Sequence, residues 1–236
     1  GAIEFYKSAK KAGIKPIIGI EAYLAARGMQ DKVHGTDDKR YHLILLAKNN
    51  TGYQNLLKLV TASNLEGFYY KPRIDKEILR KHSEGLIALS ACLTGEISRA
   101  LAGKRHEQAE TLAREYQDIF GKDNFYIELS HHPNIPNHNE VQKELRKLAR
   151  DLSIPIVATQ DVHYLKKEDR EAQDILVAVQ TNTKIDDEDR MTMKQDDFSL
   201  TSPDEMKEAF KDLPEAIQNT LAIADKIDIN INLGNI

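Results

Sequence analysis

The chain has 236 residues, of which 41% are apolar and 30% are charged, a composition that is ordinary for a globular protein with one sizeable core. Its net charge of −4 argues against a chain that binds nucleic acid through its overall charge, and no apolar run reaches the ~18 residues that a membrane span needs. A single cysteine, Cys92, excludes an internal disulfide framework and fits a reducing cytoplasm.

The first half of the chain is predicted to alternate helices with strands. Residues 2–12 carry Ile3, Tyr6 and Ala9 on one helical face and end at Gly13, which predicts an amphipathic helix and not a signal peptide. The next predicted elements are a buried strand at 14–20, an exposed loop at 27–40, a strand at 41–47, a helix at 52–63 capped by Asn50 or Thr51, and a loop at 64–72.

The second half continues the alternation, and Asp75 is predicted to cap a short helix. The later elements are a strand at 85–90, helices at 95–102 and 107–120, a strand at 125–129, a helix at 139–151, a strand at 154–159 and helices at 167–179 and 214–227. The polar stretch 182–197 is predicted to be a linker or a surface excursion. Strands that alternate with helices predict a parallel α/β sheet or barrel.

Polar side chains follow three of the predicted buried strands. Glu21 follows the first strand, Cys92 follows strand 85–90, and Asp161 and His163 follow strand 154–159. The C-terminal ends of parallel strands form the functional face of α/β folds, so we expect these side chains to share one edge. Carboxylate, imidazole and thiolate together suit zinc, manganese or iron, and such metals assist phosphoester hydrolysis.

Each of these residues also has an interpretation without a metal. A buried cysteine is commonly a small core residue, and Glu21 could cap a helix or pair with a lysine. His42 lies at the start of its predicted strand, so it reaches the same edge only if a hairpin brings it round. Asp161 and His163 are better candidates, because polar residues rarely close a buried strand without a role.

Four segments carry a resemblance to a known family: GIKPIIGIEAYLA, YHLILLAKNNTGYQNLLKL, LIALSACLTGEI and VATQDVHYLKKEDREAQDILVAVQ. Together they resemble the polymerase-and-histidinol-phosphatase (PHP) domain, in the form found in the alpha subunit of bacterial DNA polymerase III. The resemblance implies an α/β fold, a distorted seven-stranded TIM-like β/α barrel. Residues 1–200 would form the metal-binding PHP domain, and residues 201–236 a helical segment that leads toward the polymerase palm.

The resemblance implies a set of metal ligands that are spread along the chain. They are Glu21, His42, Cys92, Asp161 and His163. The implied cofactor is a cluster of divalent zinc, manganese or iron ions, and the implied activity is phosphoester hydrolysis, including 3′–5′ exonuclease (proofreading) activity. His132 matches a position that is often histidine in the family, and we do not count it among the ligands.

Two features depart from the family pattern. The His-x-His and Asp-His-Gly segments that open the family do not precede Gly1, and the acidic motif of the polymerase palm is absent. We therefore expect an N-terminally truncated piece of the alpha subunit, a DNA-directed DNA polymerase of the bacterial cytoplasm. Its barrel and metal cluster would be incomplete, and it would not polymerise DNA itself.

The resemblance also implies partners and leaves two alternatives open. The expected partners are the palm, thumb and fingers of the same polymerase, a proofreading exonuclease subunit, and the sliding clamp and DNA through other domains. The first alternative is a metal-free scaffold that docks the proofreading subunit. The second is a free-standing PHP phosphatase that acts on a small phosphomonoester.

Overall fold

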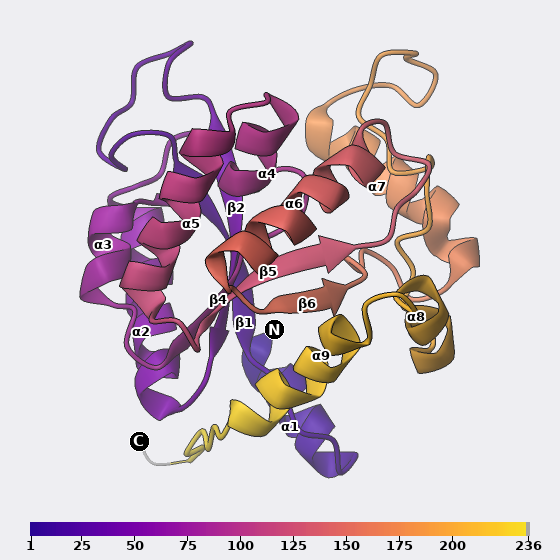
Figure 1. Cartoon of the computed structure of the whole chain (residues 1–236). Helices are drawn as coiled ribbons and strands as arrows, with labels where there is room; N and C mark the ends of the chain where they lie inside the picture. The colour runs from indigo at the N-terminus through magenta and orange to yellow at the C-terminus, as the bar shows by residue number, and fades with distance from the viewer. Residues whose placement is uncertain (235–236) are drawn as a thin grey trace.

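The computed structural model describes residues 1–234, so the last two residues of the predicted segment 201–236 lie outside the described part. One six-stranded sheet forms its centre, with the strand order β3-β1-β2-β4-β5-β6 (Figure 1). The strands are β1 (Gly19–Ala25), β2 (Arg40–Ala47), β3 (Arg73–Ile74), β4 (Leu86–Leu89), β5 (Phe125–Ser130) and β6 (Ile156–Thr159). Within residues 1–234 the outer strands β3 and β6 do not pair, so the sheet is open. This confirms the expected α/β fold with an incomplete barrel.

The helices lie close to their predicted positions. They are α1 (Ala2–Lys11), α2 (Asn50–Leu65), α3 (Lys76–Lys81), α4 (Glu96–Ala102), α5 (His106–Phe120), α6 (His138–Leu152), the 3-10 turn η1 (Lys167–Asp169), α7 (Arg170–Thr181), α8 (Pro203–Ala209) and α9 (Pro214–Lys226). Asp75 caps α3 as predicted, whereas α2 is capped by Asn49, whose side chain accepts from the backbone N–H of Gly52. None of these helices combines the length and the apolar character needed to cross a bilayer.

The prediction of a parallel sheet is wrong for one strand, β2. It pairs antiparallel with both β1 and β4, whereas the pairs β1–β3, β4–β5 and β5–β6 are parallel. The polar loop between β1 and β2 makes them a hairpin, and hairpin neighbours must run in opposite directions. The N-terminal end of β2 therefore lies at the edge where its neighbours have their C-terminal ends.

The first predicted strand is displaced along the chain. It was expected at residues 14–20, but β1 begins at Gly19 and continues to Ala25. Pro16 has no N–H for a sheet, and Ile14 is exposed, so the early part of the apolar run stays outside the ladder. Pairing is tight at Gly19, where an added Cβ would lie 2.6 Å from the carbonyl oxygen of Leu45. Glu21 consequently lies within the strand and not after it.

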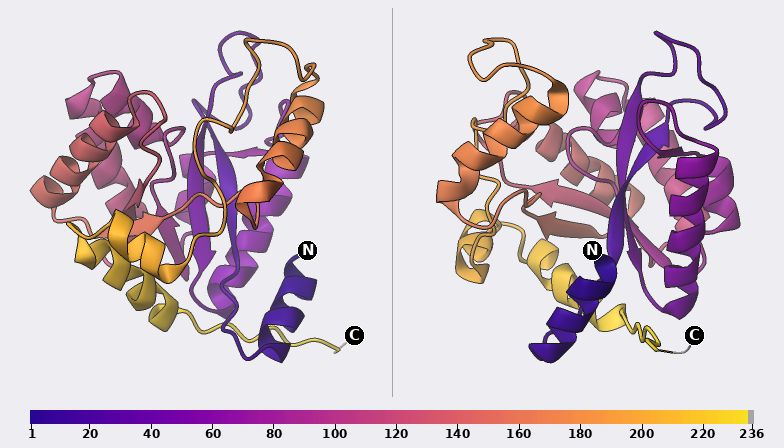
Figure 2. Two further views of the ribbon diagram at one scale, coloured as in Figure 1. Left: turned by 90° about the vertical axis from the view of Figure 1, so that its right-hand side faces the viewer. Right: turned by 180° about the vertical axis from the view of Figure 1, so that it is seen from behind.

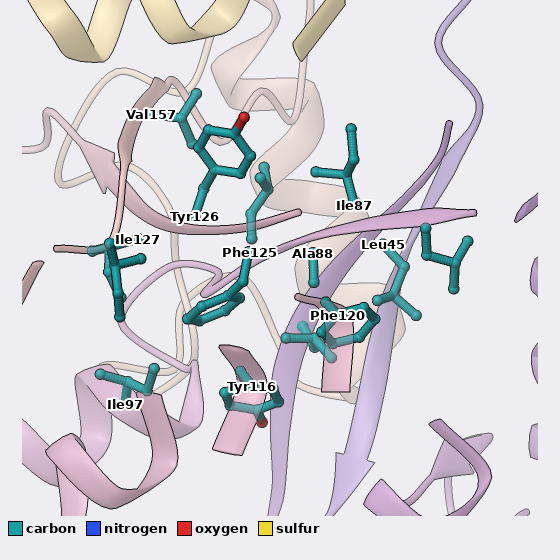
Figure 3. Close-up of a cluster of buried hydrophobic side chains, with 14 of the residues drawn as sticks. Leu45, Ile87, Ala88, Ile97, Tyr116, Phe120, Phe125, Tyr126, Ile127 and Val157 are labelled. Atoms are coloured by element: carbon teal, nitrogen blue, oxygen red, sulfur yellow. The ribbon is translucent and has the colours of Figure 1, made fainter. Parts of the chain in front are cut away.

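Apolar side chains pack on both faces of the sheet. Phe125 of β5 stacks on Tyr116 of α5 with ring centroids 5.3 Å apart, on the face covered by helices α4, α5 and α6 (Figures 2 and 3). Tyr126, the next residue, points to the opposite face beside Val157, as the alternation of a strand requires (Figure 3). Alternate residues of β5 therefore have different surroundings: one face packs against the helices, and the other faces Val157 of β6.

Two segments in the last quarter of the chain, residues 182–197 and helix α9, are held to the rest of the fold by side-chain hydrogen bonds. In the stretch 182–197, Arg190 forms a bidentate ion pair with the buried Asp174 of α7. In α9, Asn219 donates to the carbonyl oxygen of Ile156 on the outer strand β6, at 2.8 Å. The backbone N–H of Ile231 donates to the hydroxyl of Tyr6, so both ends of the described chain lie side by side (Figures 1 and 2).

Candidate metal centre

The antiparallel hairpin brings Glu21 and His42 onto one face of the sheet. Glu21 stands opposite Ile44, and His42 stands two residues before Ile44 on the same strand. Residues that are paired, or two apart on one strand, project to the same face. His42 lies at the start of its strand, which in a parallel sheet would be the wrong edge. Because β2 is antiparallel, this start lies beside Glu21.

Three of the five predicted ligands form a close group. The ligand atoms of Glu21, His42 and Cys92 all lie within 4.8 Å of one another. His42 Nδ1 is 2.5 Å from Glu21 Oε1 and 4.0 Å from Cys92 Sγ. A carboxylate oxygen, an imidazole nitrogen and a thiol sulfur converge here from three strands or their ends, and this donor set suits a zinc-like cation.

The protonation of this group shows how strongly it attracts positive charge. Burial lowers the pKa of His42, but hydrogen bonds to Cys92 and Glu21, together with the charges of these groups, outweigh it and raise the value to about 9. The hydrogen bond from His42 lowers the pKa of Glu21 against the opposing effect of burial. The raised pKa favours a protonated His42, and a bound cation would supply the same positive charge beside the carboxylate.

Cys92 is held in place by the turn that follows β4. Ala91 has a φ of +63°. The backbone N–H of Gly95 donates to the carbonyl of Cys92 at 3.0 Å, and that of His42 donates to the carbonyl of Thr94 at 3.3 Å. The turn is therefore tied directly to the first residues of β2, and this tie fixes the thiol near the imidazole.

Within residues 1–234, the close group does not include Asp161 or His163. His163 Nδ1 lies 2.6 Å from the carbonyl oxygen of Asp161 and 3.8 Å from its Oδ1. Burial raises the pKa of Asp161; the charge of His163 opposes this, and the charge of Glu21 adds to it. The Asp161 carboxylate is thus near enough to Glu21 for the two to repel each other.

The segment that carries Asp161 and His163 is pinned by a strap, residues 197–200. Gln160 donates to the carbonyl of Asp197, and the backbone N–H of His163 donates to the carbonyl of Phe198 at 2.9 Å. The ring of Phe198 meets that of His163 edge to face, with centroids 5.6 Å apart. Asp161 itself has a φ of +52°, a left-handed conformation that surrounding contacts must hold.

Two buried polar residues near this edge were not among the predicted ligands. Glu128 of β5 accepts from the hydroxyl of Thr159 at 2.6 Å through Oε1, while its Oε2 is buried without a partner in the described residues. Burial raises the pKa of Glu128 to about 7, and the charges of Asp161 and Glu21 contribute to the rise. A glutamate inside the apolar run FYIELS was a signal in the sequence, because a carboxylate is costly to bury.

His132 is the second such residue, at the end of the same strand. Its ring stacks on Phe198 at 4.3 Å, and neither ring nitrogen has a partner within the described part of the chain. Burial lowers the pKa of His132, with the charge of His138 acting in the same direction. Burial therefore favours the neutral form of this imidazole.

The chain is similar to proteins of one kind over almost its whole length. The sequence profile of the PHP domain matches residues 1–132. DNA polymerase III subunit alpha of Borreliella burgdorferi is 51% identical over 229 residues, which are 97% of this chain and 20% of that protein. The same subunit of Thermus aquaticus is 44% identical over 243 residues, 100% of this chain and 20% of that protein. The subunit of Treponema pallidum is 44% identical over 232 residues, 98% of this chain and 20% of that protein.

These similarities concern one part of much longer proteins. The chain spans about a fifth of the length of the curated relatives that it matches.

Proposed function

The chain belongs to the PHP domain family, in the form found in DNA polymerase III alpha subunits, and we propose that it forms a metal-dependent phosphoesterase centre in such a polymerase. In this proposal the metal ligands are Glu21, His42, Cys92, Asp161 and His163. The bound metal, zinc, manganese or iron, would polarise a phosphoryl oxygen of the substrate. The longer protein would be a DNA-directed DNA polymerase of the bacterial cytoplasm, with its palm, thumb and fingers, a proofreading subunit, a sliding clamp and DNA as partners.

The observation that carries the proposal is the group of Glu21, His42 and Cys92. The three side chains come from positions up to 71 residues apart, yet their ligand atoms lie within 4.8 Å. The hydrogen bonds and charges of Glu21 and Cys92 raise the pKa of His42, so this group favours a positive charge at its centre. A divalent cation would supply that charge with the ligand types it prefers.

The proposed reaction is removal of nucleotides from a DNA 3′ end. His42 and Cys92 are half-buried, whereas Glu21 is exposed, so the group is open on one side to a substrate. Asp161 and His163 lie at the same edge and carry a carboxylate and an imidazole that a metal or a substrate phosphate could contact. The domain would thus contribute a 3′–5′ exonuclease beside the polymerase.

The test is release of labelled 3′ nucleotides from a single-stranded oligonucleotide with added Mn²⁺ or Zn²⁺. The longer polymerase that contains this chain is compared, as wild type, with its Asp161→Asn variant and with Asp151→Asn, a matched control at an exposed aspartate near the end of α6. We expect release with the wild type and the control, and a loss of at least about a hundredfold with Asp161→Asn. Equal release by all three proteins would remove Asp161 from the site.

The scaffold alternative has one observation in its favour. Asp161 and His163 stay outside the close group, and His163 Nδ1 contacts the carbonyl of Asp161. A scaffold that docks a proofreading subunit needs no metal, so elemental analysis of purified protein separates the two functions. Protein that binds the subunit and holds no zinc, manganese or iron after dialysis against each would favour the scaffold.

A further inference from the structure

Two strands of the sheet, the outer strand β3 and the inner strand β5, contribute no ligand to the proposed centre. Glu21 lies on β1, His42 on β2, Cys92 after β4, and Asp161 and His163 after β6. Strand β5 lies between β4 and β6 in the sheet order, and it has no member in this set. Any side chain that β5 directs to the same face would lie between Cys92 and Asp161.

The strand registers show which residue of β5 this is. Glu21 stands opposite Ile44, and Ile44 stands opposite Leu89 of β4. Leu89 is in register with Tyr126 of β5, so all four residues share one face. Glu128 is two residues beyond Tyr126 and projects to that face as well, nearer the C-terminal ends of the strands.

Glu128 has an oxygen that the protein leaves unused. The residue is only 6% exposed, and Oε2 has no hydrogen-bond partner among residues 1–234. The hydroxyl of Thr159, on the neighbouring strand, donates to Oε1, and a backbone hydrogen bond from Ala91 also favours the ionised carboxylate. A buried carboxylate oxygen without a partner destabilises the fold, so such an atom usually has a ligand in the working state of a protein.

We propose that Glu128 is a further metal-binding residue, which completes the centre from β5 with Oε2 as an acceptor for a divalent cation. This inference rests on the proposed metal centre. It adds a buried carboxylate from β5, which lies outside the close group of Glu21, His42 and Cys92 among the described residues. Burial and the charges of Asp161 and Glu21 raise the pKa of Glu128, so three carboxyl groups influence one another here. A divalent cation bound among them would favour their ionised forms.

The test is Mn²⁺ affinity, measured by calorimetry on the 236-residue chain, together with the melting temperature with and without Mn²⁺. Glu128→Gln keeps the shape of the side chain and an acceptor for Thr159. Glu96→Gln is the matched control, because Glu96 is a half-buried glutamate on α4 that contacts Tyr116 and Lys76 on the helix-covered face. We expect Glu128→Gln to weaken Mn²⁺ binding by about ten- to a hundredfold and Glu96→Gln to leave it unchanged.

The melting temperatures separate a ligand from a structural residue. A ligand role predicts that Glu128→Gln melts at or above the wild-type temperature without metal, and that Mn²⁺ no longer raises it. A structural role predicts a lower melting temperature without metal and an unchanged rise with Mn²⁺, and that result would overturn the inference. Wild-type chain that is folded and binds no Mn²⁺ would refute the metal centre itself. Mn²⁺ binding that His42→Ala abolishes and Glu128→Gln leaves intact would refute only the role of Glu128.

Discussion

His42 stands opposite Tyr23 in the antiparallel pairing of β1 with β2, and on its other side it bridges to Gly95 in the turn after β4. This double attachment sets the imidazole between Glu21 and Cys92. Because β2 runs against its neighbours, a residue at the start of a strand reaches the same edge as residues at the ends of the others. The proposed centre depends on this one reversal of direction.

Replacement of His42 should therefore abolish metal binding at moderate metal concentrations. We expect His42→Ala to lose the stabilisation that Mn²⁺ gives the wild type, which is about 2.7 kcal/mol when the metal is at a hundred times its Kd. Chemical unfolding with and without Mn²⁺ measures this difference. His34→Ala is the control, because His34 is an exposed loop histidine paired with Asp38. An equal loss of stabilisation in both variants would contradict the assignment.

Gly95 should be required for the position of Cys92. An added Cβ would lie 2.2 Å from the carbonyl oxygen of Ser90 and 3.1 Å from that of Cys92, so Gly95→Ala must move the turn. We expect a loss of about 1–3 kcal/mol in the free energy of unfolding and weaker metal binding. Gly103→Ala is the control, since its Cβ would first meet the movable side chain of Arg105. Wild-type stability and metal affinity in Gly95→Ala would show that the turn tolerates a side chain.

The ion pair between Asp174 and Arg190 should make the fold sensitive to acid. The hydrogen bond from Arg190 lowers the pKa of Asp174 from 3.8 to about 2, although burial opposes it. A lowered carboxyl pKa adds stability above the unfolded-state value, and this stability is lost as the pH falls from about 4 toward 2.

We expect Asp174→Asn to be less stable than the wild type by roughly 3 kcal/mol at pH 7, because it leaves the charge of Arg190 without a buried partner. The difference should shrink between pH 4 and pH 2, where wild-type Asp174 becomes protonated. Denaturant unfolding across this range measures it. Asp118→Asn, at an exposed site on α5, is the control. A difference between wild type and Asp174→Asn that stays constant from pH 7 to pH 2 would argue against the ion pair.

Phe198 should matter both to stability and to the setting of His163. Its ring is buried and lies between His132 and His163. We expect Phe198→Ala to lower the free energy of unfolding by about 3–5 kcal/mol, and Phe68→Ala, at an exposed loop position, to change it by less than about 0.5 kcal/mol. The imidazole proton resonances of His163 should shift in Phe198→Ala, because the ring no longer faces them. Unmoved resonances would show that the strap does not position His163.

The sequence by itself determined where most helices and strands lie. Hydrophobic periodicity and caps such as Asp75 are local, and most of the elements they predict agree with the structure within a few residues, with β1 as an exception. The same local patterns singled out Glu21, Cys92 and the pair Asp161 and His163, because polar side chains beside buried apolar runs stand out in a sequence.

Only the tertiary structure decided how these elements combine. The direction of β2, the start of β1 at Gly19, the closeness of His42 to Glu21 and the placement of Asp161 and His163 outside the close group all depend on strand pairing. The face to which Glu128 projects also follows only from strand registers, which run across β1, β2, β4 and β5. Pairing energies arise between residues that are far apart in the chain, so periodicity within one segment does not encode which strand lies beside it or in which direction it runs.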